Sequence, residues 1–107
     1  MKYSVKISAQ AEEDLKGLYE YISFDLASQT NAFAQIGRLE RGILSLSEFS
    51  ERFALYQKEP WKTRGLRMMP QDNYLVFYIP EKDTATVNVV RVMYAGRDAE
   101  KQLDTNH

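Results

Sequence analysis

The stretch ATVNVVRVMY, residues 85–94, decides how the rest of the chain is arranged. Its apolar residues fall on both faces of an extended chain, most densely over Val87–Val90. A strand that is apolar on both faces needs cover on both sides. We therefore predict a strand over residues 85–94 at the centre of a sheet.

Two shorter apolar runs, Leu66–Met69 and Tyr74–Ile79, precede this strand. Between them stands Pro70–Asn73, whose residues favour turns, and a second break of the same kind follows at Pro80–Asp83. Apolar runs separated by short turns are typical of antiparallel strands that pair in sequence order. We predict a three-stranded antiparallel meander that ends in the central strand.

In the N-terminal half the spacing of apolar residues changes from that of a strand to that of a helix. Residues 2–8, KYSVKIS, alternate between polar and apolar side chains, which is typical of a half-buried strand. From there the apolar residues recur every three or four positions, which predicts a helix over about 9–26 with Ser8 as its N-cap. The same spacing of three or four residues returns over about 30–49 and predicts a second helix. The short break between these segments predicts two antiparallel helices.

Residues 50–63 follow neither period, and we predict a surface connection from which Tyr56 and Trp61 fold back against the core. From Arg97 the sequence turns polar, which permits a short C-terminal helix or a frayed end. The order of elements predicts one α+β domain over residues 1–107. In it a helical hairpin covers one face of a mostly antiparallel four-stranded sheet.

The composition limits the possible chemistry. The chain has no cysteine and a single histidine, His107, so a zinc site built from Cys and His is excluded. Any metal would rest on carboxylates alone, and we expect no metal and no other cofactor. No 18-residue apolar run is present, and the start MKYSVKISAQ lacks the apolar core of a secretory signal. We expect a cytoplasmic protein without a membrane partner.

Charge is nearly balanced but unevenly placed. Fourteen Lys and Arg against fifteen Asp and Glu give a net charge of -1, so the whole molecule is not attracted to nucleic-acid phosphates. The segment from Lys58 to Arg67 is basic, and the N-terminal third is acidic. Glu12, Glu13 and Asp14 suit the first turn of a helix, where its dipole favours acids, better than a catalytic role.

Three segments in register carry a resemblance to a known family: ISAQAEEDLKGLYEYI, GLRMMPQDNYLVFYI and VNVVRVMYAGRD. Together they resemble the RelE/ParE superfamily of bacterial toxins from type II toxin-antitoxin and plasmid stabilisation modules, over roughly residues 1–103. The resemblance implies growth inhibition, and neutralisation by a small, partly disordered antitoxin. It also implies that operator DNA is bound only through the antitoxin.

The superfamily has two branches, and the residues favour one of them. RelE-like members resemble ribosome-dependent mRNA endoribonucleases (mRNA interferases), whereas ParE-like members act on DNA gyrase. The resemblance puts Arg67 and Arg97 at two family arginine positions. The position of the family tyrosine falls near Leu103, where this chain has no tyrosine. Two residues could replace that tyrosine: Tyr94, which we expect to be packed, and the terminal His107. If the chain is RelE-like, the catalytic residues are Arg67, Arg97 and Tyr94.

Three features favour the ParE-like branch: the lack of a tyrosine near Leu103, the balanced charge and the sequence RVMYAGRD. They favour a gyrase inhibitor that is not an enzyme. An mRNA endoribonuclease is one alternative. An inactive toxin fold retained as an antitoxin partner is the other.

The residues predicted to contact a target are cationic or aromatic: Trp61, Lys62, Arg64, Arg67, Arg91 and Arg97. The basic residues around Trp61 resemble a patch whose ring could stack a base. Arg91 interrupts an apolar strand. It is either a cation lining a cleft, half of an ion pair with an acid of the first helix, or a side chain at the open face of the sheet. We expect Arg67 to point away from the helical layer.

The remaining predicted contacts concern the chain's last strand and its methionines. Asp98 is placed to cap a following helix, which leaves Arg97 as the better candidate for an anionic target. Methionine is flexible and suits adaptable apolar surfaces. We therefore predict that Met68, Met69 and Met93 contact the antitoxin.

Overall fold

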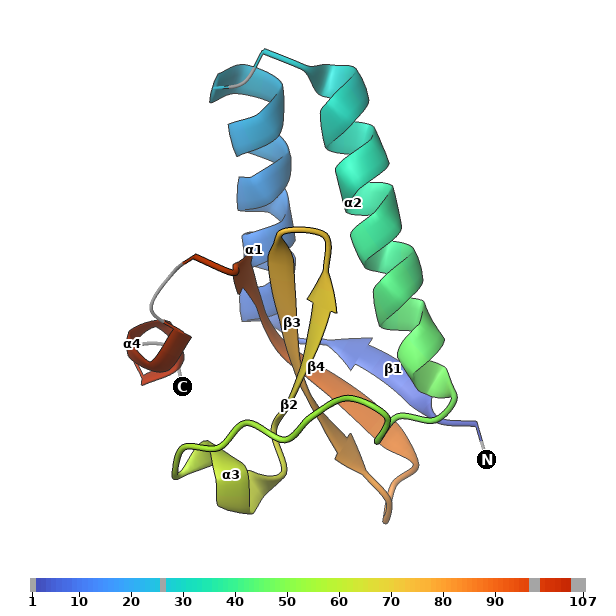
Figure 1. Cartoon of the computed structure of the whole chain (residues 1–107). Helices are drawn as coiled ribbons and strands as arrows, with labels where there is room; N and C mark the ends of the chain where they lie inside the picture. The colour runs from blue at the N-terminus through green and yellow to red at the C-terminus, as the bar shows by residue number, and fades with distance from the viewer. Residues whose placement is uncertain (1, 26, 97–98, 105–107) are drawn as a thin grey trace.

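Figure 1 shows the computed structural model of the chain, which describes residues 2–25, 27–96 and 99–104. The sheet has the strand order β1-β4-β3-β2. β1 (Ser4–Ile7) runs parallel to β4 (Thr86–Tyr94), and β4, β3 (Tyr74–Glu81) and β2 (Arg67–Gln71) are antiparallel in turn. The predicted α+β class, the mostly antiparallel sheet and the central place of β4 are confirmed.

Two long helices form the predicted hairpin on one face of the sheet (Figure 1). α1 (Ala9–Glu20) continues in a π-helical turn over Tyr21–Asp25, and α2 (Gln29–Leu44) ends in a 3-10 turn over Ser45–Ser47. Ser8 caps α1 as predicted, since its Oγ accepts a hydrogen bond from the N–H of Ala11 at 3.0 Å.

The second helix ends earlier than the predicted residue 49. Arg52 donates from Nη1 to the backbone carbonyl oxygens of Ser45, Glu48 and Phe49, so a side chain satisfies carbonyls that a longer helix would have used. Phe49 itself has a positive φ of 51°, which is incompatible with a continuing helix. Apolar spacing alone does not indicate this contact, because Arg52 lies beyond the end of the helical pattern.

The sheet is covered on both faces. The first apolar cluster lies between the hairpin and the sheet and includes Ala11, Leu39, Ile43, Leu46, Met69, Val76, Tyr78, Val87, Val89 and Val92. The second lies on the opposite face and includes Tyr56, Trp61, Leu66, Phe77, Met93 and Leu103. The prediction that Tyr56 and Trp61 fold back against the core is therefore confirmed.

Two short helices lie beside the second cluster. α3 (Trp61–Arg64) was not predicted; a Glu59 carboxylate oxygen accepts from the N–H of Thr63 at 3.0 Å, and Gly65 ends the helix with φ 83°. α4 (Ala99–Asp104) is the short C-terminal helix that the polar sequence permitted. Within the residues that the structure describes, no helix is long and apolar enough to cross a membrane.

A bulge in β4 changes the face of Arg91. Phe77 pairs with Arg91 but Tyr78 pairs with Val89, so Val90 is an extra residue in the ladder. Simple alternation along β4 would place Arg91 on the face of Val87 and Val89, and the bulge moves it to the other face. Arg91 shares its face with Phe77, opposite the hairpin.

Arg67 also lies on the other face from the one expected. It pairs with Tyr78 and so shares the face of Met69, next to the helical layer. The expectation that Arg67 points away from the helices is wrong. Its neighbours Leu66 and Met68 pack in the second cluster, so their apolar character does not mark the helical face.

Candidate functional site

The edge of β4 is covered by side chains where β1 is too short to pair with it. β1 ends at Ile7, opposite Val89, and β4 continues to Tyr94. Beyond that point the hydroxyl of Ser8 donates to the carbonyl oxygen of Val90 at 3.0 Å. Asp14 Oδ2 then accepts from the N–H of Val92 at 2.9 Å. The first turns of α1 thus replace a strand along this part of the edge.

Asp14 also forms a bidentate ion pair with Arg91. Arg91 Nε lies 2.7 Å from Asp14 Oδ2, and Arg91 Nη2 lies 3.0 Å from Asp14 Oδ1. Both side chains are buried, and Arg91 Nη1 donates to the backbone carbonyl oxygen of Gln102 in α4 at 2.9 Å. Of the interpretations left open for Arg91, the ion pair with an acid of the first helix is confirmed.

Sequence reasoning missed Asp14 as the partner, because it assigned this acid to the helix dipole. Only Glu12 lies in the first turn. A signal was present, since Asp14 stands three residues after Ala11 and four before Leu18, on the apolar side of the helix. A carboxylate on that side needs a buried partner.

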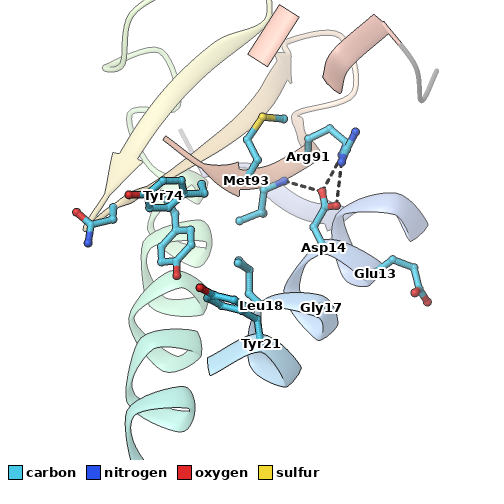
Figure 2. A pocket seen from close by; sticks show the side chains of 11 residues that line it. Glu13, Asp14, Gly17, Leu18, Tyr21, Tyr74, Arg91 and Met93 are labelled. Carbon is cyan, nitrogen blue, oxygen red and sulfur yellow. Dashed lines mark hydrogen bonds and ion pairs between the residues drawn. The ribbon is translucent and has the colours of Figure 1, made fainter. Parts of the chain in front are cut away.

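A pocket of about 650 Å³ opens where this side-chain cover ends. Gly17, Leu18 and Tyr21 line it from the helical side, and Tyr74 and Tyr94 line it from the strands. Figure 2 shows Leu18 and Tyr21 facing Tyr74 across the pocket, with Asp14 and Arg91 joined beside it. The pocket is therefore mostly aromatic and aliphatic, with one neutralised ion pair in its wall and with Glu13 and Asn73 as further polar lining residues.

The tyrosines of the pocket differ in exposure. Tyr74 is buried, and its burial, reinforced by Tyr21, Tyr94 and Asp72, raises the pKa of its hydroxyl. Tyr94 meets the Tyr74 ring edge-on at 6.0 Å between ring centres but is 50% exposed. The expectation that Tyr94 is packed is wrong, because it lies past the covered part of β4.

Arg67 is held elsewhere, by the loop before α3. Its Nη1 donates to the carbonyl oxygens of Glu51 at 3.0 Å and Phe53 at 2.7 Å, and its Nη2 lies 3.7 Å from the Glu51 carboxylate. Arg67 pairs with Tyr78 and Tyr94 pairs with Tyr74, so their partners in β3 are separated by three residues. The structure does not bring Arg67 and Tyr94 together.

The predicted basic patch is present on α3, but its aromatic residue is not accessible. Lys62 and Arg64 are exposed, whereas Trp61 is buried with the Arg64 guanidinium 4.9 Å from the centre of its ring. In this arrangement the indole offers no open face for stacking a base. Contact of Lys62 and Arg64 with a target stays a prediction.

The other predicted contact residues fall into two groups. Met69 and Met93 are buried in the first and second clusters, and Met68 is partly buried in the second. Of the three, Met93 also lines the pocket. Arg97, Asp98 and His107 lie outside the described residues, so their predicted roles stay predictions.

Within the described ranges, no group of His, Cys, Asp or Glu could hold a metal ion.

Comparisons with known proteins agree on the fold. The family described as "ParE toxin of type II toxin-antitoxin system, parDE" matches residues 5–99. No curated protein matches the chain by sequence.

Several solved structures are similar, including the following three. A chain of the chromosomal ParDE TA system from P. aeruginosa has a TM-score of 0.71 and 16% identity, over 87% of this chain and 96% of that one. A chain of the RelBE2 toxin-antitoxin complex from Mycobacterium tuberculosis has a TM-score of 0.66 and 19% identity, over 88% and 99%. A double mutant of the E. coli toxin RelE in the free state has a TM-score of 0.66 and 13% identity, over 99% and 94%. At these identities the likeness shows the fold alone.

Proposed function

Because the chain belongs to the ParE toxin family of type II toxin-antitoxin systems, we propose that it arrests growth by binding DNA gyrase. In this proposal it acts as a binding protein, without cutting a nucleic acid. The observation that carries the proposal is the engagement of two predicted cations, Arg67 and Arg91, inside the chain.

A metal-free RNA nuclease needs cations that meet the charged phosphorus of the transition state and a group that moves the 2'-hydroxyl proton. Arg91 would have to leave a buried carboxylate to meet a phosphate, and Arg67 would have to leave two carbonyl oxygens. Tyr94, the substitute for the family tyrosine, lies at the pocket, away from Arg67. This separation supports a binding protein over a nuclease.

A cognate antitoxin is the second part of the proposal. Two of the similar structures belong to toxin-antitoxin assemblies, ParDE and RelBE2, which supports a partner of the same kind here. Such a partner, disordered in its binding segment, gains order on the toxin surface. Contact with operator DNA is assigned to the antitoxin, because the toxin's net charge of -1 gives it no general attraction to DNA.

An mRNA endoribonuclease remains the second candidate, supported by the fold shared with the E. coli toxin RelE and by the half-exposed hydroxyl-bearing ring of Tyr94. An inactive toxin fold, kept as an antitoxin partner, is the third. Growth arrest separates this last candidate from the other two.

The test combines purified gyrase with cells in which the gene is induced alone. We expect the protein to inhibit supercoiling and to cause DNA breaks, while RNA 5' ends stay unchanged. Codon-positioned RNA breaks with intact DNA would favour the nuclease instead.

Charge reversal on α3 tests whether this face meets the target. Lys62→Glu with Arg64→Glu should weaken gyrase inhibition several-fold, because both side chains are exposed cations. The matched control reverses two exposed cations at the N-terminal strand, Lys2→Glu with Lys6→Glu. Equal effects of the two pairs would mean that net charge, and not this patch, matters.

A further inference from the structure

Gly17 lies inside α1 on the wall of the pocket. A Cβ atom at this position would meet no other atom within 4 Å, so crowding inside the chain does not explain the glycine. Glycine in a helix interior is less stable than alanine because it loses more backbone freedom on folding. The isolated chain therefore carries a glycine that costs helix stability and gives no packing in return.

The space in front of Gly17 is apolar and open. Leu18 and Met93 contribute aliphatic surface, and Tyr21 and Tyr94 are each 50% exposed. Large apolar side chains left half exposed around one hollow are typical of surfaces that a partner covers. Because glycine has no side chain, a group of the partner can approach the helix backbone closely at Gly17.

The charges of the lining residues restrict the partner further. Asp14 and Arg91 neutralise each other, as described above. Among the lining residues that the structure describes, the other formal charge is that of Glu13, and it is negative. The electron-rich faces of Tyr21 and Tyr94 attract cations as well. The rim therefore suits a partner segment that carries lysine or arginine.

We propose that this pocket holds a segment of the cognate antitoxin, which inserts one bulky apolar side chain against Gly17 and places a lysine or arginine beside Glu13. The inference rests on the proposed function only in taking an antitoxin as the occupant; it does not depend on gyrase as the target. The exposed predicted target-binding cations Lys62 and Arg64 are not among the described residues that line the pocket, whereas Arg91 lines it as half of the ion pair with Asp14. One face thus serves neutralisation, and another is left for the target.

The steric test fills the pocket from the toxin side. Gly17→Leu should weaken binding of the antitoxin encoded in the same operon at least tenfold in calorimetric titration, because the new side chain occupies the space of the inserted one. Its thermal midpoint should stay the same or rise, since leucine favours helix more than glycine. Ala34→Leu, which also introduces a leucine but at an exposed position of α2, should bind the antitoxin like the wild type.

The electrostatic test does not depend on the folding of that variant. Glu13→Lys should weaken antitoxin binding several-fold, and added salt should reduce the difference from wild type. Glu12→Lys makes the same change one residue away, at an exposed position of α1 that does not line the pocket, and should have a smaller effect.

Unchanged antitoxin affinity in both Gly17→Leu and Glu13→Lys would overturn the proposal. So would a wild-type homodimer that Gly17→Leu dissociates without loss of antitoxin affinity, because the occupant would then be a second copy of the chain. If the wild-type protein fails to inhibit gyrase but Gly17→Leu loses the antitoxin, the pocket assignment holds and the proposed target is wrong.

Discussion

Asp14 connects parts of the molecule that are far apart in sequence. Its carboxylate accepts from the Arg91 side chain and from the Val92 backbone, and Arg91 reaches on to the carbonyl oxygen of Gln102. One acid of α1 thereby links the helix to the central strand and, through Arg91, to α4. A buried charge of this kind stabilises the fold only as long as its partner is present.

Asp14→Asn tests this dependence. The amide keeps the shape of the side chain but removes its charge, which leaves the Arg91 guanidinium buried without a counter-ion. We expect a loss of about 3–5 kcal/mol in the free energy of unfolding, measured by urea denaturation. The double variant Asp14→Leu with Arg91→Met should lose less than Asp14→Asn, because neither charge remains. A loss under about 1 kcal/mol for Asp14→Asn would mean that water screens the pair.

At the scale of elements, Ser8 has two roles at the junction of β1 and α1. Its Oγ caps the helix at Ala11 and donates to the carbonyl oxygen of Val90 in the central strand. Ser28 caps α2 in a comparable way, by accepting from the N–H of Asn31 at 3.2 Å. The two serines therefore differ mainly in the contact with the sheet.

Ser8→Ala should cost about 1–2 kcal/mol of stability, since it removes a helix cap and a hydrogen bond to the strand. Ser28→Ala should cost less, because it removes a cap alone. Urea denaturation of both variants gives the comparison. Equal losses would show that the Val90 contact adds nothing to the cap.

At the scale of the whole molecule, the buried hydroxyl of Tyr78 links stability to pH. It donates to the carbonyl oxygen of Ser50 at 2.7 Å, and burial raises the pKa of this tyrosine above its usual 10.0. The folded state thus keeps the proton that the unfolded chain loses as the pH rises past 10.0. Stability from this group is complete below that pH and decreases above it.

Tyr78→Phe should therefore lower stability at neutral pH by about 1 kcal/mol, through the lost hydrogen bond. Above pH 10.0 its stability should decrease less steeply than that of the wild type. Some slope should persist, because burial also raises the pKa of Tyr74. Parallel stability curves for the two proteins would contradict the role of Tyr78.

Much of the fold could be predicted from the sequence, because apolar periodicity is a local signal. The strand over 85–94, the helical hairpin and the meander all have such a signal. The bulge at Val90 does not, since it depends on the register between two strands. The faces of Arg67 and Arg91 could not be derived by alternation for related reasons, because both faces of the sheet carry apolar clusters.

The pocket could not be predicted from residue types. It exists because β1 is shorter than β4 and because the side-chain cover of the edge ends at Val92. Gly17 alone gave no sign of it, since a helical glycine has several possible causes. The lengths of two elements distant in sequence had to be known first.

The parallel pairing of β1 with β4 has a consequence for synthesis. Ser4 pairs with Thr86, so the first strand must wait for a partner that is translated 82 residues later. At about 5–20 residues per second, this delay lasts roughly 4–16 seconds. Throughout that interval the nascent polypeptide has no completed sheet, so any surface that depends on the pairing of β1 with β4 forms only after Thr86 has been translated.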